Sequence, residues 1–239
     1  MTPDFFIGLK NPVTFYIIRH GQSEGNAEKI MQGRGEYALT ELGRSQSAMR
    51  GLSLKHLVLQ NAQKNAWQGN ILYFSSPMKR AKETTLIIGK ESGLGQPQFL
   101  EDLMEMELGV WTGKTWDEVK SEKELWQDFR RRSWDAIPQA ESSGDLYSRS
   151  LRIWAALRDA AMEKEAGTVV VVTHGGLIQW LLKSTMGSKD WLPLLPISNC
   201  GLFKLSVEPL PEQNGAFFCW DEINSPLAAK TENARGFPT

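Results

Sequence analysis

The stretch VTFYIIRHG, residues 13–21, decides the fold class of this chain. Its first six residues are all β-branched or aromatic and no charged side chain interrupts them, which is typical of a strand covered on both faces. Arg19, His20 and Gly21 follow directly, so they are expected just beyond the carboxyl end of a buried strand. The segment therefore predicts a layered protein built around a sheet.

Helical and strand patterns alternate along the rest of the chain. Thr40 is a suitable N-cap for a helix with Ala48, Met49 and Leu52 on its apolar side, and Pro77 fits the first position of a later helix. The expected helices span residues 45–59, 77–93, 142–164 and a segment from 177 onward, and the further expected strands span 71–75, 169–172, 202–207 and 216–220. This alternation predicts an α/β fold with a largely parallel sheet, closed at one edge by the last two strands.

Residues 105–143 interrupt this alternation. They contain Trp111, Trp116, Trp126 and Trp134 among many charged residues, and we interpret them as helical turns that form a cap outside the sheet. These tryptophans could line a substrate wall or pack the cap onto the body of the protein. The whole chain, residues 1–239, is expected to form a single domain with a loose tail over residues 224–239.

The composition is that of an ordinary soluble globular protein. Among 239 residues, 41% are hydrophobic and 27 basic side chains balance 28 acidic ones, which argues against a nucleic-acid or membrane partner. No apolar run reaches the ~18 residues that cross a bilayer, and the first apolar run is too short for a signal sequence. Cys200 and Cys219 are too few for a disulfide framework and are expected to be buried reduced thiols. These features predict a cytoplasmic protein, either a monomer or a homodimer.

Three of the expected strands end in residues that could act together. The first is followed by Arg19 and His20, the second leads through Ser76 into a helix that carries Arg80, and another ends at His174 and Gly175. Ligands bind beyond the carboxyl ends of the strands in open α/β sheets. We therefore expect the imidazoles of His20 and His174 to lie a few ångströms apart, with both arginines beside them.

Two histidines beside two arginines predict an anion site rather than a metal site, because guanidinium groups repel cations and match phosphate oxygens. Positive neighbours lower the pKa of imidazole, so one histidine could attack phosphorus in its neutral form and become a phosphohistidine. A nearby acid would then protonate the leaving oxygen. Glu105 is our candidate for this acid, and Glu107 is the alternative.

Six ordered segments of the chain resemble the histidine phosphatases, the phosphoglycerate-mutase-like superfamily. They are residues 19–26 (RHGQSEGN), 33–43 (GRGEYALTELG), 76–84 (SPMKRAKET), 103–113 (LMEMELGVWTG), 141–149 (ESSGDLYSR) and 173–176 (THGG). The resemblance covers about residues 13–186. Four positions depart from the family pattern: Gln22 replaces a common Glu, Gly25 a common aromatic residue, Glu36 an Asp and Ala38 a Pro.

This resemblance implies a three-layer α/β/α fold with a mostly parallel central sheet and a helical cap insertion. It implies that His20 becomes phosphorylated, that Glu105 donates the proton and that His174 takes part in catalysis. The residues implied to bind the phosphoryl group and the substrate are Arg19, Asn26, Gln32, Gly33, Arg80 and the Gly175 amide. No metal and no cofactor are expected.

Several residues also have purely structural interpretations. His20 and His174 could be hydrogen-bonded core histidines, and Arg19 and Arg80 could form structural ion pairs. His56 is expected on the solvated surface. The cluster Arg130, Arg131 and Arg132 could hold a second anionic group of the substrate, although a solvated helix face is the commoner outcome.

The sequence predicts a metal-independent phosphatase that hydrolyses a small phosphomonoester through His20. A cofactor-dependent phosphoglycerate mutase is the alternative, but residues 105–111 (EMELGVW) lack the basic and tyrosine residues that such mutases have after the acid. A non-catalytic scaffold that binds a phosphorylated ligand is a third possibility.

Overall fold

The computed structural model describes residues 5–64, 69–210, 212 and 215–227. Its centre is a six-stranded sheet with the order β3-β2-β4-β1-β5-β6. The strands are β1 (Val13–Arg19), β2 (Asn70–Ser75), β3 (Gln98–Phe99), β4 (Ala166–Thr173), β5 (Leu202–Leu210) and β6 (Gly215–Ser225). The first four lie parallel, and the antiparallel pair β5 and β6 closes one edge, as the sequence predicts. The two-residue strand β3 was not predicted.

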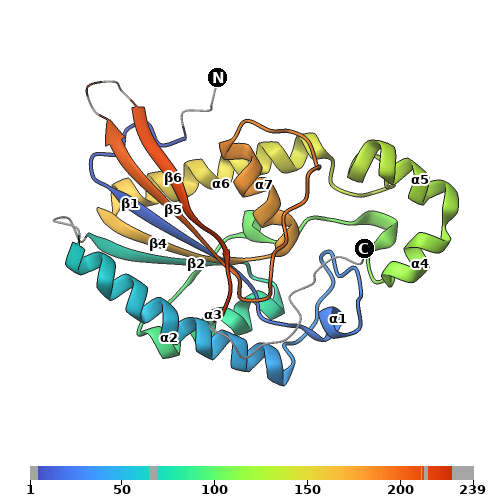
Figure 1. The fold of residues 1–239 in the computed structure, drawn as a ribbon, viewed down its shortest axis with the longest axis horizontal. Coiled ribbons are helices and arrows are strands. Elements are labelled where there is room, and N and C mark those ends of the chain that lie inside the picture. The colour runs from blue at the N-terminus through green and yellow to red at the C-terminus, as the bar shows by residue number, and fades with distance from the viewer. Residues whose placement is uncertain (1–4, 65–68, 211, 213–214, 228–239) are drawn as a thin grey trace.

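Helices cover both faces of this sheet (Figure 1). On one face lie α2 (Glu41–Lys64) and α3 (Lys79–Ser92), and on the other lie α6 (Ser143–Glu163) and α7 (Gly175–Thr185). The side chains of β1 alternate accordingly: Tyr16 and Ile18 pack with the α2 and α3 side, and Phe15 and Ile17 pack with the α6 and α7 side. The three-layer α/β/α prediction is therefore confirmed.

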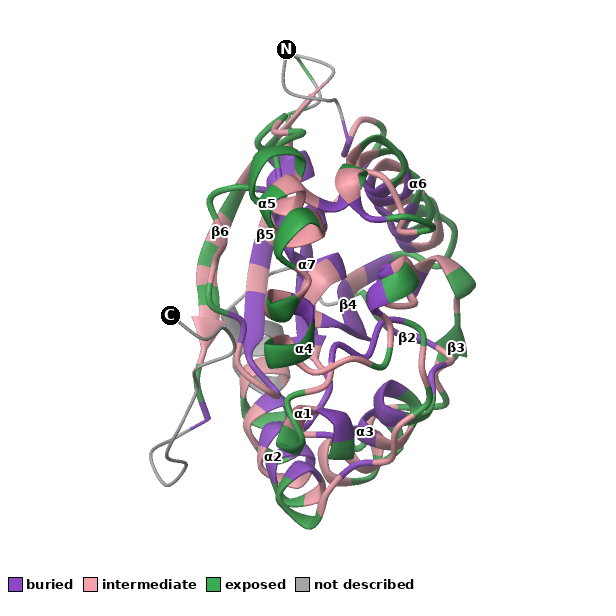
Figure 2. Cartoon of the chain, turned by 90° about the vertical axis from the view of Figure 1, so that its right-hand side faces the viewer, coloured by how far each residue is buried: buried purple, intermediate pink, exposed green. Residues whose placement is uncertain are grey.

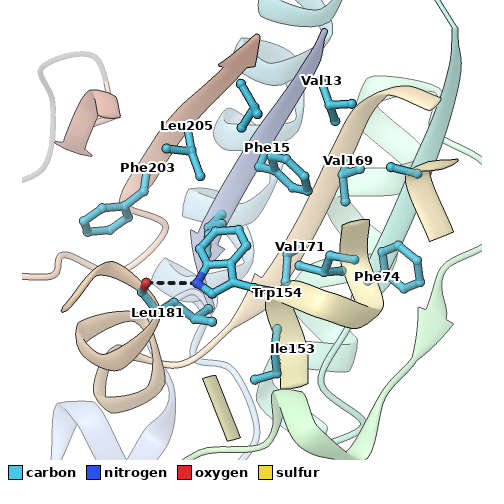
Figure 3. Close-up of a cluster of buried hydrophobic side chains, with 14 of the residues drawn as sticks. Val13, Phe15, Phe74, Ile153, Trp154, Val169, Val171, Leu181, Phe203 and Leu205 are labelled. Carbon is cyan, nitrogen blue, oxygen red and sulfur yellow. Dashed lines mark hydrogen bonds between the residues drawn. The ribbon is translucent and has the colours of Figure 1, made fainter. Parts of the chain in front are cut away.

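The core under α6 is the larger of the two (Figure 3). Trp154 of α6 lies against Phe15 of β1 with ring centroids 5.6 Å apart, and its indole N–H donates to the carbonyl oxygen of Leu181 at 3.1 Å. Because Leu181 belongs to α7, this bond joins the two helices over strands β1 and β4. Packing of this kind fixes the carboxyl ends of those strands relative to α7.

Helix α2 differs from the predicted pattern. Thr40 is its N-cap, because the Thr40 hydroxyl accepts from the Gly43 amide at 3.0 Å, but Leu52 of the predicted apolar stripe is 50% exposed. Its buried side instead carries small and polar residues, including Ser47 and Arg50. The Arg50 guanidinium donates to the carbonyl oxygens of Cys200 and Ser225, so these hydrogen bonds balance the burial of its charge.

The cap consists of short helical segments beyond the carboxyl ends of the strands. They are η2 (Gly109–Trp111), α4 (Trp116–Ser121), α5 (Lys123–Arg132) and η3 (Ser133–Ala136). Trp111 and Trp134 are buried in its core, and Figure 2 shows α5 mostly in the colours of exposed and intermediate residues. The packing interpretation of the cap tryptophans is confirmed for Trp111 and Trp134, and Trp134 and Trp116 also line a cavity described below.

Other local predictions need correction. Pro77 precedes the N-cap Met78 and is not the first residue of α3. Strand β6 extends to Ser225, so Asn224 and Ser225 do not belong to a loose tail, and residues 228–239 lie outside the described residues. Cys200 is a buried free thiol as expected, whereas the Cys219 thiol is exposed because its strand lies at the edge of the sheet.

None of the helices in the described residues is long and apolar enough to span a membrane. The cytoplasmic location stays a prediction.

Candidate active site

Parallel pairing brings the two histidines together. Arg19 of β1 lies in register with Thr173 of β4, so His20 and His174 follow at the same level, and their ring centroids are 5.2 Å apart. Strand β2 is the next neighbour of β4, and the hydroxyl of Ser76, just after β2, lies 2.8 Å from Nε2 of His174. The predicted juxtaposition of the imidazoles is confirmed. Ser76 lies in the motif of residues 76–84, but the sequence pattern does not indicate this contact.

Two hydrogen bonds set the tautomer of His20. Its Nδ1 lies 2.7 Å from the carbonyl oxygen of Gly21, which can only accept, so Nδ1 carries the proton. Its Nε2 accepts from Nε of Arg80 at 3.3 Å. The side chain is therefore a neutral imidazole whose Nε2 has the lone pair.

Burial and positive neighbours keep both rings neutral. Burial is the largest cause that lowers the pKa of His20 well below its ordinary value, and the charges of Arg80 and Arg19 lower that pKa further. Burial is also the main cause of the lowered pKa of His174, followed by the charge of Arg80. Both side chains are almost fully buried, at 2% and 0% exposure.

The lowered pKa values predict a loss of stability in acid. Below pH ~6.5 the unfolded chain protonates His20 and His174 while the folded chain does not. The free energy of unfolding should therefore fall as pH drops from 6.5 toward the lowered folded values, by up to about 1.4 kcal/mol per pH unit for each histidine.

Urea unfolding at pH values above and below 6.5 measures this slope. It should be steeper in the natural protein than in His20→Asn, which lacks one of the two groups. Equal slopes in the two proteins would contradict a lowered pKa for His20.

The two arginines differ in which of their guanidinium N–H groups have hydrogen-bond partners. Arg80 donates from Nη2 to the Gly33 carbonyl at 2.8 Å and from Nη1 to the Gly35 carbonyl at 2.7 Å. Arg19 donates from Nη1 to the Ile197 carbonyl at 2.5 Å, but its buried Nε has no hydrogen-bond partner among the described residues. The buried Nδ1 of His174 is also without a partner in that part of the chain. Unpaired buried polar atoms of this kind are typical of a binding site for a polar ligand.

Glu105 and Glu107 have different surroundings. The Glu105 carboxylate accepts from the backbone amides of Gly176 at 3.2 Å and Leu177 at 3.1 Å, at the start of α7. A side chain at Gly176 would put its Cβ 2.7 Å from Glu105 Oε1, so a larger residue there would displace the Glu105 carboxylate. Glu107 accepts from the Thr112 hydroxyl and the Leu108 amide and does not line the cavity below. Of the two candidates, Glu105 is the one that shares the site with His20.

A buried ion pair holds the backbone on both sides of Glu105. Arg149 of α6 donates to the carbonyl oxygens of Asp102 and Met104 and pairs with the Glu141 carboxylate at 2.7 Å. Glu141 in turn exchanges hydrogen bonds with the backbone of Glu107. The quoted segment 141–149 gave a signal for this pair, but its role was visible only in three dimensions.

The remaining predicted residues also lie around the site. Asn26 Oδ1 accepts from the Asn199 side chain, whose amide also donates to the His20 carbonyl. Asn199 lies in none of the sequence motifs, so this contact was not predicted. Gln32 accepts from the Ser23 hydroxyl at 2.8 Å, and its side chain fills the space beside Gly25, where an added Cβ would lie 2.6 Å from Gln32 Cγ. This contact accounts for glycine at position 25. Glu36, another departure from the family pattern, accepts from the Lys79 amide at the start of α3.

A cavity of about 140 Å³ connects these groups. The predicted residues that line it are Arg19, His20, Asn26, Gln32, Gly33, Arg80, Glu105 and Gly175. His174 lies behind it, against His20 and Ser76. Arg130, Arg131 and Arg132 are exposed and do not line the cavity, and His56 is exposed as expected.

Comparison with known proteins agrees with this geometry. Residues 15–211 match the histidine phosphatase superfamily, branch 1. A probable phosphoglycerate mutase, GpmB of Yersinia pestis, is 30% identical over 206 residues, which cover 82% of this chain and 86% of that protein.

Several solved structures of phosphatases and mutases share this fold. A mycobacterial glucosyl-3-phosphoglycerate phosphatase in complex with VO3 is 26% identical with a TM-score of 0.72, over 90% of this chain and all of that one. A phosphoglycerate mutase from Bacillus anthracis shares the fold with a TM-score of 0.71 at 21% identity, over 92% of this chain and 95% of that one. With its paired strand-end histidines and this extent of similarity, the chain belongs to branch 1 of the histidine phosphatase superfamily, an enzyme superfamily of phosphohydrolases and mutases.

Proposed function

We propose that this protein is a phosphatase that hydrolyses a phosphomonoester through a phosphohistidine on His20, without a metal ion or cofactor. The observation that carries the proposal is the hydrogen bonding of His20. With its proton on Nδ1, bonded to the Gly21 carbonyl, the ring presents the Nε2 lone pair beside the Arg80 guanidinium. A neutral nucleophile next to fixed positive charge suits attack on an anionic phosphoryl group.

In the first step, the Nε2 lone pair forms a bond to phosphorus while the bond from phosphorus to the ester oxygen breaks. Glu105 donates its proton to that leaving oxygen, and the alcohol departs. Arg19 and Arg80 hold the phosphoryl oxygens, and an anionic oxygen would replace Nε2 of His20 as the acceptor of the Arg80 Nε–H. Gly175, at the start of α7, adds its backbone amide, and Asn26, Gln32 and Gly33 complete the wall.

In the second step, the Glu105 carboxylate takes a proton from water while the water oxygen attacks phosphorus. The bond from phosphorus to Nε2 breaks, its electron pair returns to the ring, and inorganic phosphate leaves. His20 and protonated Glu105 are restored. Three backbone amides, those of Met106, Gly176 and Leu177, fix the Glu105 carboxylate and support this role as positioned acid and base.

The residues after Glu105 favour hydrolysis over mutase activity. Met106 and Leu108 contribute apolar side chains to the cavity, while Glu107 is bonded to Thr112. A mutase must retain a doubly phosphorylated intermediate until the phosphate is returned, and these side chains offer it no charge. The non-catalytic scaffold is the less favoured alternative, because both histidines, both arginines and the acid are present.

Incubation with 4-nitrophenyl phosphate in excess EDTA tests the proposal. We expect stoichiometric release of nitrophenol and phosphate at an unchanged rate with EDTA. A second reaction, with 3-phosphoglycerate and its bisphosphate primer, measures mutase activity. Isomerisation without phosphate release would contradict hydrolysis, and loss of activity in EDTA would contradict metal independence.

A further inference from the structure

The cavity has a polar inner end and an apolar outer wall. The inner end is formed by the strand-end groups described above, chiefly Arg19, His20 and Arg80. The outer wall consists mainly of Met31, Met106, Leu108, Trp116, Trp134 and Trp191. All of these side chains belong to, or pack against, the hydrophobic core of the cap. The part of the cavity that would receive the leaving group is therefore an opening in the cap core.

The aromatic part of this wall is held in place by its own contacts. The rings of Trp134 and Trp191 meet edge to face, with centroids 5.6 Å apart. The buried Lys183 ammonium donates to the carbonyl oxygens of Asp190 and Trp191 and lies 5.5 Å from the Trp191 ring centroid. Trp116 is half-buried at the start of α4. A wall that is fixed before binding keeps its shape without additional ordering of side chains.

Positive charge is confined to the phosphoryl end. Among the described residues that line the cavity, only Arg19 and Arg80 are arginine or lysine. Arg34 lies close to Glu105, but its Nε donates to the Glu105 carbonyl and its Nη2 lies 3.6 Å from the Glu141 carboxylate. Lys114 pairs with Glu122. A carboxylate or second phosphate on the leaving group would lose its hydration against an apolar wall that offers it no counter-charge.

We infer that the substrate is a phosphate monoester of an uncharged, largely apolar alcohol, preferably one that carries a flat ring. This inference rests on the proposed function and adds the chemical class of the leaving group. A flat apolar ring would bury its faces against the three tryptophans while its phosphate lies between the arginines. Phosphoglycerate and sugar bisphosphates do not fit this wall, since each has a second anionic group.

A pair of substrates with similar intrinsic reactivity tests this class. Hydrolysis of 2-phenylethyl phosphate and of glycerol 1-phosphate each releases a primary alcohol, so a difference in kcat/KM reports binding of the leaving group. We expect kcat/KM to be on the order of 10²-fold higher for the phenylethyl ester, as burial of a phenyl ring predicts. Equal values, or faster hydrolysis of 3-phosphoglycerate, would overturn the inference while leaving the proposed function intact.

Two tryptophan variants provide a matched comparison. Trp116→Ala removes a half-buried tryptophan that lines the cavity, and Trp126→Ala removes a half-buried tryptophan of the same cap that does not. The preference for the phenylethyl ester should fall about tenfold in Trp116→Ala, as loss of the ring contact predicts, and stay unchanged in Trp126→Ala. A uniform loss on both substrates in Trp116→Ala would contradict a role in specificity.

Binding of ligands that cannot be hydrolysed tests the same apolar leaving-group site without turnover. Calorimetry with 2-phenylethylphosphonate and ethylphosphonate, which are not hydrolysed, should show tighter binding of the phenyl compound. If none of 4-nitrophenyl phosphate, 2-phenylethyl phosphate and glycerol 1-phosphate releases phosphate but this binding preference is found, the proposed function fails and the inferred class of ligand stands. If the two phosphonates bind equally, the apolar leaving-group site fails whatever the activity.

Discussion

Replacement of His20 by alanine is expected to lower the rate of phosphate release by ~10⁴-fold or more, because the nucleophile that forms the covalent intermediate is lost. The neighbouring His174 does not replace it, since its Nε2 is bonded to Ser76 and its ring is held 5.2 Å from that of His20. The measurement is a phosphate-release assay under saturating substrate, with labelled phosphate trapped on the enzyme in alkali.

His56→Ala is the matched control for this change. His56 is exposed on α2, so its loss should leave both the rate and the trapped phosphate unchanged. Circular dichroism and thermal unfolding of both variants separate a lost nucleophile from a lost fold. Phosphate release by His20→Ala at more than about a hundredth of the natural rate would rule out His20 as the nucleophile.

Substitution of Arg80 is expected to lower kcat/KM by ~10²-fold to ~10³-fold, the usual effect of removing a preorganised group that stabilises transition-state charge. Arg80→Lys retains a charge but loses the planar fork that bonds Nε2 of His20 and the carbonyls of Gly33 and Gly35. Arg80→Met removes the charge as well, and it also leaves two carbonyl acceptors without this donor.

The two Arg80 variants should differ in their pH profiles. Arg80 is the first charge, after burial, that lowers the pKa of His20. Its loss in Arg80→Met should raise that pKa, so the acid limb of kcat/KM should move to higher pH than in Arg80→Lys. Lys82→Met is the control, because Lys82 is an exposed cation on the same helix. Identical acid limbs in the natural protein and Arg80→Met would show that Arg80 does not set the charge state of His20.

Sequence patterns predicted the elements whose packing is simple. Strand β1 was evident because its residues are apolar on both faces, and α6 was evident because Leu146, Ile153 and Leu157 recur at helical spacing and are all buried. The buried side of α2 was predicted incorrectly, since it carries small and polar residues beside Leu54, and the partners of its buried Arg50 are backbone carbonyls of β6 and of the segment before β5. Such partners lie more than a hundred residues away, so no local periodicity reveals them.

The active site likewise has features that sequence motifs predicted and contacts that only the structure shows. The ordered motifs identified His20, Arg80, Glu105 and His174, because each stands at a fixed offset from a strand end or a glycine. They did not indicate that Glu105 is bonded to the start of α7, or that the Arg149–Glu141 pair holds its backbone. Those contacts join segments that are adjacent only after the sheet and cap have packed.

The sequence by itself thus determined the α/β class of the fold, its largely parallel sheet and the kinds of groups at the strand ends, because the alternation of helical and strand patterns and the spacing of motifs are local properties of the chain. The tertiary structure alone decided the protonated nitrogen of His20, the backbone amides that hold the Glu105 carboxylate, and the apolar wall beyond the phosphoryl end. Each of these depends on which side chains from distant segments share one cavity, and that is fixed by packing rather than by order along the chain.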